Sequence, residues 1–277
     1  MTMNSINTNA QALIALQSLN TTNAQMSVVQ KRVSTGYRVA DARDDGGAFA
    51  VAQAVRSDVA GVIAVGEQLG GVKGVLQTTF AALSVVSDTM KQIRAVLTRL
   101  ADAAISTDQR DTYEEQYTLL AKQVEDFIDD ATYNGRTLLS TDTADNGGDI
   151  TAIRNEGGGT FTIEAVNGDT LKITSTAPAS ATEAQGFIAS GGDFDDIDTE
   201  LSLALNKFGA SMTFVDSQIT YNSKKVDAMT EGLGALVDAD LAKESSSLEA
   251  LKVRQQLGVQ TLGLANQGPQ ILLGLFR

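Results

Sequence analysis

Apolar residues recur along three stretches of the chain at spacings that alternate between three and four. The first seam holds Leu69, Val72, Leu76, Thr79, Leu83, Val86, Met90, Ile93, Leu97, Leu100 and Ala104. The second holds Tyr113, Tyr117, Leu120, Val124, Phe127 and Ala131, and the third holds Leu201, Leu205, Phe208, Met212, Val215, Ile219, Asn222, Val226, Met229, Leu233 and Leu236. Because 3.5 residues per repeat nearly match the helical turn, each seam keeps facing a partner helix. The pattern predicts a mainly α fold, a long antiparallel coiled-coil bundle.

Two seams contain one polar member each, Thr79 and Asn222. Such a residue can fix the register of a bundle at some cost in stability. Alternatively, both side chains lie at the edge of a seam and bond to water. The sequence leaves both interpretations open. Under the first, replacing Asn222 by Leu would stabilise the bundle but blur its register.

The helix that carries the first seam is predicted to run from about Phe49 to about Ala104. Glycines inside a helix cost about 1 kcal/mol each, so we expect a neighbouring backbone to pack closely against them. These glycines are Gly61, Gly66, Gly70, Gly71 and Gly74. A capping signal over residues 106–109 then begins the next helix, which is predicted to end near Asn134 and Gly135.

Both ends of the chain have helical spacing but lack charge: residues 1–30 and 255–276 contain no charged side chain. The outer face of a helix exposed to water normally carries charge, so these ends are expected to be interfaces. The amino end lacks the basic region of a cleavable signal peptide. The predicted interface residues are Ile6, Leu13, Leu16, Leu19, Met26, Leu248, Leu251, Leu257, Leu262, Leu264, Leu272, Leu275 and Phe276.

The helical period disappears between Arg136 and Gly192. Alternating apolar residues predict a β-hairpin with a three-residue loop, in which Ile163 pairs with Leu171 and Phe161 with Ile173. Residues 141–200 carry 2 basic and 12 acidic side chains, a net charge of -10. We therefore predict an exposed acidic insertion at about residues 136–196.

The composition excludes most of the familiar classes of enzyme chemistry. The chain contains no Cys and no His, so it lacks thiolate ligands, the commonest general base and the commonest metal ligand. Asp44 and Asp45 are adjacent carboxylates that could act as an acid–base pair. A simpler interpretation is that they form surface salt bridges with Arg38 and Arg43. No catalytic, cofactor or metal site is expected. The net charge of -13 argues against nucleic acid, and no apolar run long enough to span a membrane is found.

Two further motifs are weak. The glycine-rich stretch 66–74 lacks the Gly-Lys-Ser/Thr ending of a phosphate-binding loop. The acidic stretch 193–198 has no glycine at its sixth place, and Ala204 stands at the twelfth, so it does not match an EF-hand. A solvated acidic loop is the expected structure there.

Three segments resemble the terminal signatures of bacterial flagellin, the subunit of the flagellar filament. They are MTMNSINTNAQAL, RVSTGYRVADARDDGGAFAVAQAVRSD and VDADLAKESSSLEALKVRQQLGVQTLGLANQGPQILLGLFR. The resemblance covers roughly residues 1–135 and 200–277. It implies that the paired terminal helices, residues 1–40 and 237–277, form an inner filament-core domain. Residues 41–236 would then form the surrounding bundle domain, with a small hairpin and too short an insertion for large outer domains.

The resemblance implies a structural protein that self-assembles into the extracellular filament for motility. It also implies secretion through the flagellar export apparatus, an export chaperone, and contacts with the filament cap and hook-junction proteins. The alternative is a hook-filament junction or other adaptor, which would not grow filaments when seeded. An enzyme or ligand-binding module, the third class, would need a polar pocket for which the sequence offers no candidate.

Two more expectations concern the assembled state. The acidic insertion is expected on the outer surface, where hydroxyls are open to glycosylation at Thr141, Thr143, Thr151, Thr176 and Ser180. Ordering the backbone of the terminal arms costs more free energy than the burial of their own apolar side chains contributes. We therefore expect both arms to be disordered in the free subunit and to fold on assembly.

Overall fold

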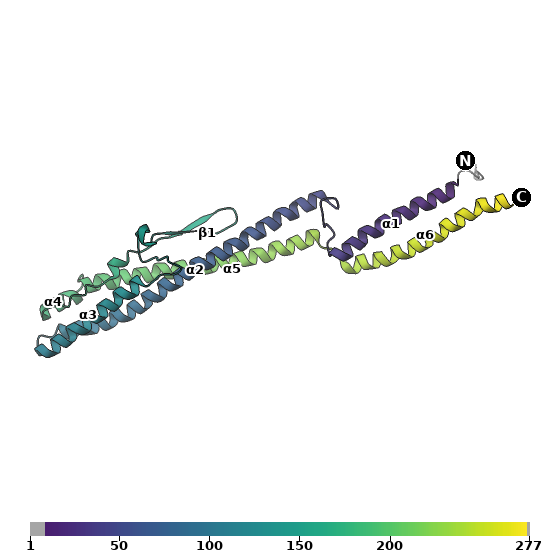
Figure 1. The fold of residues 1–277 in the computed structure, drawn as a ribbon. Helices are drawn as coiled ribbons and strands as arrows, with labels where there is room; N and C mark the ends of the chain where they lie inside the picture. The colour runs from purple at the N-terminus through teal and green to yellow at the C-terminus, as the bar shows by residue number, and fades with distance from the viewer. Residues whose placement is uncertain (1–8, 276–277) are drawn as a thin grey trace. The chain divides into compact units, whose positions relative to one another are not determined.

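The computed structural model describes the backbone of residues 9–275, with the side chains of 145 and 268–275 left aside. Its elements in chain order are α1 (Ala10–Thr35), α2 (Gly46–Leu100), α3 (Thr107–Asp129), η1 (Thr143–Asp145), β1 (Ile150–Ile153), β2 (Thr160–Ile163), η2 (Gly168–Leu171), α4 (Ala181–Ile188), α5 (Asp193–Val237) and α6 (Leu241–Leu275) (Figure 1). They form two compact units, Asp58–Asp227 and Met1–Ser57 with Ala228–Arg277. The predicted mainly α class with a small hairpin is confirmed.

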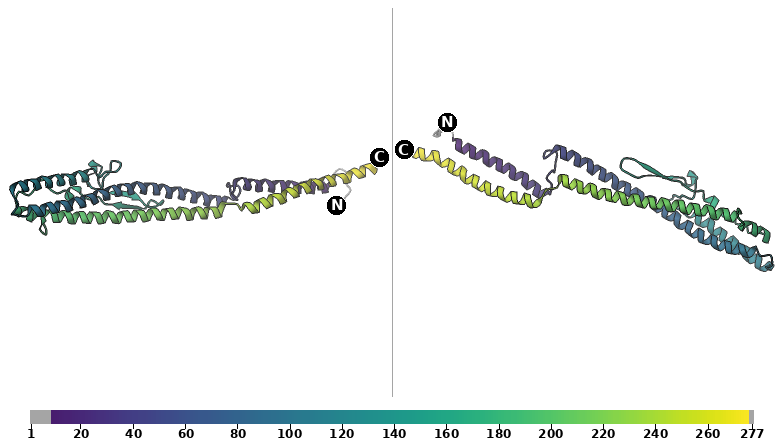
Figure 2. Two further views of the ribbon diagram at one scale, coloured as in Figure 1. Left: turned by 90° about the horizontal axis from the view of Figure 1, so that it is seen from below. Right: turned by 180° about the vertical axis from the view of Figure 1, so that it is seen from behind.

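The first seam forms the core of the unit Asp58–Asp227. Its members from Leu69 to Leu100 are fully buried, apart from the partly buried Val72. The central members of the other seams are buried with it, including Tyr117 and Val124 on α3 and Leu201, Phe208 and Val215 on α5. Within this unit α2, α3 and α5 run side by side, as the two views in Figure 2 show. The alternating spacing therefore predicted the bundle correctly.

The helix ends differ from the predicted ones by a few residues, and a side-chain cap explains the earlier start of α2. α2 begins at Gly46, where the Asp45 carboxylate accepts the Ala48 N–H at 3.0 Å, and it ends at Leu100, before Ala104. The Ser106–Gln109 capping box is present, and α3 ends at Asp129. The acidic loop predicted at 193–198 is wrong: these residues form the first turn of α5, where carboxylates favour the positive helix end.

The predicted hairpin is wrong in its partner strand. β2 pairs with β1, not with the later segment, and Ile150 faces Ile163 while Ala152 faces Phe161. The turn uses the glycine-rich stretch 155–159, where Gly158 has φ +80. The segment predicted as the second strand contains η2 instead, because the Asn167 side chain caps the Asp169 N–H at 3.0 Å.

The insertion contributes to the core as well as to the surface. Buried side chains from it join the bundle core: Leu138, Leu139, Ile150, Ile163, Leu171, Ile173 and Ala184. The buried Tyr117 hydroxyl donates to the Thr174 carbonyl at 2.8 Å, and its burial, followed by the charge of Asp193, raises the pKa of this phenol. The acidic groups stay outside while the apolar face of the insertion packs on the helices.

The helix glycines meet fewer neighbours than predicted. A Cβ on Gly74 would lie 2.6 Å from the Tyr133 ring, and one on Gly61 would lie 3.1 Å from the Glu156 side chain. Nothing lies within 4 Å of such an atom on Gly66, Gly70 or Gly71. Close packing therefore explains two of the five, and the principal contacts are side chains rather than the predicted backbone.

The two polar seam residues are both buried and differ in their bonding. Asn222 is 3% exposed; its amide accepts from Gln218 at 3.1 Å and donates to the Arg154 carbonyl at 3.3 Å. Lys225 on α5 pairs with Glu156, which lies in the turn between β1 and β2. Asn222 thus helps attach the hairpin turn to α5. Thr79 is 0% exposed, and its hydroxyl has no partner among the described residues.

α2 also meets the length and composition of a membrane-spanning helix. It contains an 18-residue window with a mean hydropathy of 1.5, of which 17% is buried. The expectation that no stretch is apolar enough is therefore wrong on composition. The helix carries the seam that packs in the bundle core, and the absence of a membrane span stays a prediction.

Replacing Thr79 by Val should stabilise the protein by about 1 to 3 kcal/mol. The change keeps the side chain's shape and removes a buried hydroxyl that has no partner, whose desolvation costs about that much. Urea unfolding followed by circular dichroism measures the change in midpoint at constant slope.

Thr89→Val is the matched control. Thr89 is 4% exposed, and its hydroxyl donates to the Val85 carbonyl at 2.9 Å. Its replacement should be neutral or destabilise by up to about 1.5 kcal/mol. A destabilised Thr79→Val protein would show that the Thr79 hydroxyl is satisfied in solution.

Candidate assembly surface

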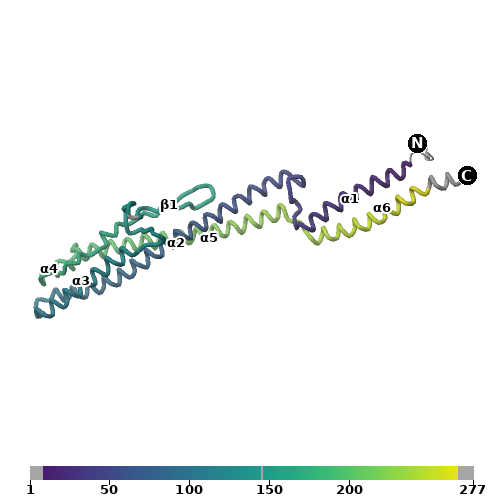
Figure 3. The backbone as a smooth tube through the Cα atoms, viewed as in Figure 1, coloured from purple at the N-terminus to yellow at the C-terminus, as the bar shows by residue number. Residues whose placement is uncertain are grey.

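α1 and α6 pair antiparallel in the unit that contains both chain ends (Figure 3). Three polar contacts at intervals along the pair fix its register: Asn9 Nδ2 to the Ala265 carbonyl at 2.7 Å, Gln255 Nε2 to Asn23 Oδ1 at 2.8 Å, and Arg32 Nη1 to Glu244 Oε1 at 3.1 Å. The α1 residue number rises as the α6 number falls. The two arms are therefore held in one alignment by side chains that are mostly uncharged.

Each helix of the pair turns one row of residues toward the other. The α1 row is only partly buried and again alternates by three and four: Ala12, Ala15, Leu19, Thr22, Met26, Val29 and Val33. The α6 row has the same spacing: Leu248, Leu251, Gln255, Gly258, Leu262 and Ala265. A Cβ on Gly258 would lie 3.2 Å from Leu19 Cδ1, so glycine allows a close approach at this point.

Other large apolar side chains of the two helices are exposed. We call this set the open face: Leu13, Ile14, Leu16 and Val28 on α1, with Leu241, Val253, Leu257, Val259 and Leu264 on α6. Ile14 is 68% exposed and Leu264 is 74% exposed. Both line a hollow of about 510 Å³ together with Gln11, Ala15, Ser18, Thr261 and Ala265. An apolar surface of this kind is typical of a protein interaction site.

The predicted interface residues divide between the two rows and the open face. Leu19, Met26, Leu248, Leu251 and Leu262 lie on the paired rows, whereas Leu13, Leu16, Leu257 and Leu264 lie on the open face. Ile6 and Phe276 lie outside the described residues, as do the side chains of Leu272 and Leu275.

The prediction missed five residues of the open face: Ile14, Val28, Leu241, Val253 and Val259. Spacing alone could not separate the two faces, because the arms are apolar around much of their circumference. The charge-free stretch 1–30 did mark both α1 residues among them, without showing which way they point.

The pair has almost no core of its own. Within α1 no residue is buried, and among the described α6 side chains only Leu251 is. The buried cluster of this unit consists of Val39, Ala52 and Val237, with Ala48, Phe49 and Leu233 packed against it. It lies beside the connections rather than between the two arms.

An ionic cluster holds the connection between α1 and α2. Lys31 Nζ lies 2.9 Å from Asp41 Oδ2 and 2.8 Å from Asp44 Oδ2. The Asp44 carboxylate also accepts the Ala40 N–H at 3.0 Å. Surface ion pairing was predicted, but the predicted partners are wrong: Asp44 pairs with Lys31, while Arg43 pairs with Asp41 at 3.2 Å.

The remaining predicted group, Asp45, caps α2, and Arg38 donates to the Leu236 carbonyl. The bond from Lys31 is the main cause that lowers the pKa of Asp41 far below its usual range. The same bond lowers the pKa of Asp44, and the two carboxylates raise the pKa of Lys31. The cluster is thus an electrostatic clamp on the connection, with no free carboxylate pair for acid–base work.

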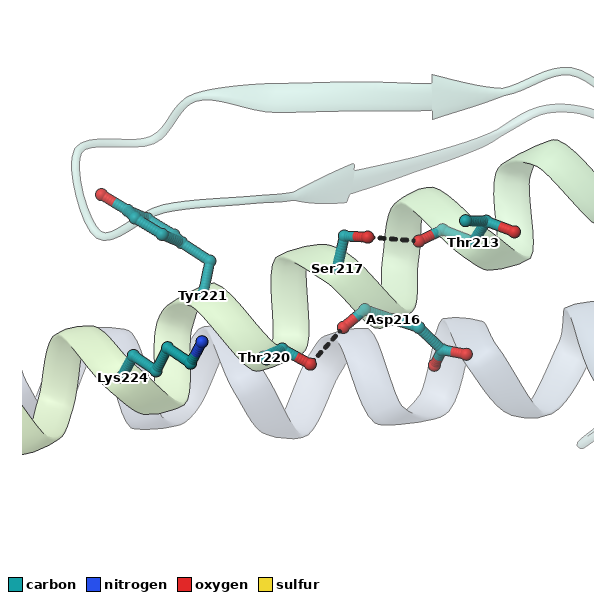
Figure 4. Close-up of a pocket in the computed structure, with 6 residues that line it drawn as sticks. All are labelled: Thr213, Asp216, Ser217, Thr220, Tyr221 and Lys224. Carbon is teal, nitrogen blue, oxygen red and sulfur yellow. Dashed lines mark hydrogen bonds between the residues drawn. The ribbon is translucent and has the colours of Figure 1, made fainter.

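A hollow of about 480 Å³ lies on α5 and is lined by polar side chains (Figure 4). The Ser217 and Thr220 hydroxyls donate to carbonyls of their own helix, and Asp216 pairs with Lys73 at 2.7 Å. The hydroxyls of Ser217 and Thr220 and the carboxylate of Asp216 are therefore already used within the fold. Over the described residues, no cluster of three or more acidic side chains could hold a metal ion; the absence of catalytic residues and cofactors stays a prediction.

Comparison with known proteins identifies the family of this chain. The family model for the bacterial flagellin N-terminal helical region matches residues 6–144, and the model for the bacterial flagellin C-terminal helical region matches residues 194–276. The chain belongs to the bacterial flagellin family.

Individual flagellins agree with this assignment over the full length. Flagellin FljK of Caulobacter vibrioides is 34% identical, with 100% of both chains covered, and a flagellin of Brucella melitensis is 32% identical over 99% of this chain and 100% of its own. The crystal structure of Bacillus cereus flagellin, with 20% identity and a TM-score of 0.51, covers 56% of this chain and 88% of that one. The latter supports the fold alone.

This flagellin is therefore a structural subunit that assembles with other flagellin subunits into the bacterial flagellar filament, the extracellular part of the flagellum, and serves motility. The family is structural rather than enzymatic. Nothing in the comparisons favours the alternative of a hook-filament junction protein.

Replacing Lys31 by Met should raise the pKa values of Asp41 and Asp44 toward the ordinary value. In the parent protein the clamp stabilises the connection above the aspartate pKa of about 4 and weakens as the pH falls below it. Because the pKa of Lys31 is raised, its contribution is complete below about pH 10 and is lost above that. Carboxyl NMR titration measures both aspartates.

Lys91→Met is the matched control, because it removes an exposed ion pair with Asp88 on α2 at 2.8 Å. It should leave the titration of Asp41 and Asp44 unchanged. If Lys31→Met also leaves both curves unchanged, the clamp does not exist in solution.

Proposed function

We propose that the α1–α6 pair is the filament-core domain and that its open face packs against the same helices of neighbouring subunits. The observation that supports this is the open face itself, a row of exposed leucines, isoleucine and valines on helices with almost no buried residue of their own. Residues 10–30 and 255–267 of a second copy offer the same charge-free surface, so the contact there would bury apolar side chains without burying charge.

The polar residues of α1 fit such a dry contact. The Thr21 hydroxyl donates to the Gln17 carbonyl at 2.9 Å. On α6, the Thr261 hydroxyl donates to the Leu257 carbonyl at 2.8 Å. Because these donors are already satisfied by their own helices, covering them with a neighbour costs little.

The same lack of core supports folding on assembly. One helix partner covers one side of each arm, and the apolar area that would offset the ordering cost lies on the uncovered side. The paired helices are thus the conformation that the filament holds, whereas free subunits populate it weakly. An arm of this kind also unfolds at little cost, which suits passage through the flagellar export apparatus.

The partners before and during assembly follow from this exposed surface. An export chaperone would cover the α6 leucines before secretion, since an exposed apolar face promotes aggregation. The filament cap and the hook-junction proteins would meet the same arms at the two ends of the filament.

The acidic insertion would face outward, because its net charge of -10 over residues 141–200 would make burial between subunits costly. Among the predicted glycosylation sites, Thr151 bonds to the Thr162 hydroxyl at 3.2 Å, and Ser180 caps α4. Thr141, Thr143 and Thr176 are exposed and make no hydroxyl bond to the described residues, which favours them as acceptors.

Substitutions on the open face test the proposal. Leu16→Gln and Leu264→Gln should leave the secondary structure of the free subunit unchanged, because both side chains are exposed. Each should raise the critical concentration for seeded filament growth about 10- to 100-fold, since a buried leucine contributes about 1.5 to 3 kcal/mol and 1.4 kcal/mol is tenfold.

Leu119→Gln provides the control, because Leu119 is 64% exposed on α3, outside the arms. It should grow filaments at the parent's critical concentration. Parent-like growth of both arm variants would show that the open face is not the assembly surface.

A further inference from the structure

Three Asn-Gly pairs occur in the segment that follows α3: Asn134–Gly135, Asn146–Gly147 and Asn167–Gly168. In such a pair the glycine backbone nitrogen can attack the asparagine side-chain carbon Cγ, because no Cβ hinders its approach. A bond forms between that nitrogen and Cγ, the bond from Cγ to the amide nitrogen breaks, and ammonia leaves with the glycine N–H proton. Water then opens the cyclic imide at either carbonyl, giving aspartate or isoaspartate.

The attack requires that the glycine backbone nitrogen can move toward the asparagine side chain. In two of the pairs a hydrogen bond holds this nitrogen in place. The Gly147 N–H donates to the Asp142 carbonyl at 3.0 Å, and the Gly168 N–H donates to the Leu139 carbonyl at 2.9 Å. Both glycines are buried, and a Cβ on either would lie 2.4 Å from a carbonyl oxygen. The imide cannot form at these sites without local unfolding.

Gly135 differs in each of these respects. It is exposed, nothing lies within 4 Å of a Cβ placed on it, and no acceptor among the described residues bonds its N–H. Asn134 and Gly135 have φ values of 50 and 74, the two central positions of a type I′ turn. The turn's two hydrogen bonds, at 2.9 and 3.0 Å, join Tyr133 to Arg136 and leave the central peptide free.

We infer that Asn134 is the site at which this chain deamidates spontaneously in its folded state, yielding aspartate and isoaspartate. Isoaspartate adds a methylene to the main chain of a turn whose two hydrogen bonds depend on exact spacing. The change would loosen the turn and the Tyr133 ring that covers Gly74 on α2. Either product also adds one negative charge beside the acidic insertion. The fraction of aspartate and isoaspartate at this turn would thus increase with the age of the subunit.

Peptide mapping can follow all three pairs in one digest. Trypsin cuts after Lys122, Arg136, Arg154 and Lys172, so each Asn-Gly pair falls in its own peptide: 123–136, 137–154 and 155–172. The folded full-length chain is incubated in mildly alkaline buffer, digested briefly at mildly acidic pH, where trypsin still cleaves and deamidation is slow, and analysed by mass spectrometry with fragmentation. An Asn134→Asp protein marks the elution of the aspartyl product and separates it from isoaspartate.

We expect Asn134 to convert at least about tenfold faster than Asn146 and Asn167, a ratio that corresponds to about 1.4 kcal/mol of protection. In urea the three rates should converge, because all three are Asn-Gly pairs in an unfolded chain. An Asn134→Gln protein should lose the conversion in peptide 123–136 and keep the slow rates elsewhere.

Two results would overturn the inference. One is conversion of Asn146 or Asn167 as fast as Asn134 in the folded chain. The other is an unchanged Asn134 in the folded chain over a time in which the urea-unfolded chain converts at all three pairs.

Discussion

A helix that meets one partner can cover only one side of itself. This constraint shapes the unit that contains the chain ends. The paired rows of α1 and α6 use up one face of each helix, and the leucines and valines of the open face remain in water. In an ordinary soluble helix that face would be charged. Here it is apolar, and along residues 10–30 and 255–267 the polar groups between the apolar ones are hydroxyls and amides. In the proposed account, neighbouring copies of the chain cover this face in the filament.

In the unit Asp58–Asp227, other segments of the same chain cover the apolar face of the long helix. Its long helix meets α3, α5 and the insertion, so the seam from Leu69 to Leu100 is covered on all sides. The insertion covers part of the bundle with its apolar residues and turns its acidic ones outward. Its hairpin turn is tied to α5 by Gln218, Asn222 and Lys225. A complete core of this kind is stable without neighbours, which is what a subunit needs before it assembles.

Charge on the α1–α6 pair is concentrated in the half next to the connection to α2. Along α1 the first charged residue is Lys31, near the end of the helix, and it clamps the connection to α2 through Asp41 and Asp44. On α6 the ion pair of Glu244 with Arg32 lies at the same end of the pair. The far ends of both arms are left with uncharged groups. The ion pairs thus fix the base of the pair, and the hydrogen bonds of Asn23 and Asn9 fix its register beyond the base.

The sequence predicted the features that depend on periodicity and failed where contacts distant in sequence decide. The seams of the bundle core and the Ser106 capping box follow from spacing, and they were predicted correctly, although Ala104 lies beyond the end of α2 and Leu236 is exposed. The interface role of the charge-free arms stays a prediction. The hairpin partner was wrong because two apolar alternations competed for β2, and the glycine-rich turn at 155–159 favoured the nearer β1. The open face could not be separated from the paired rows, because both are apolar, and only the position of the partner helix distinguishes Leu16 from Leu19.

Amide hydrogen exchange of the same chain as free subunit and as filament tests the dependence of the arms on their neighbours most directly. Amides of α1 and α6 should exchange rapidly in the free subunit and become protected in the filament, while amides of α2 along the buried seam should be protected in both states. Equal, strong protection of α1 and α6 in the free subunit would contradict the account, because it would show that the pair is stable without any neighbour.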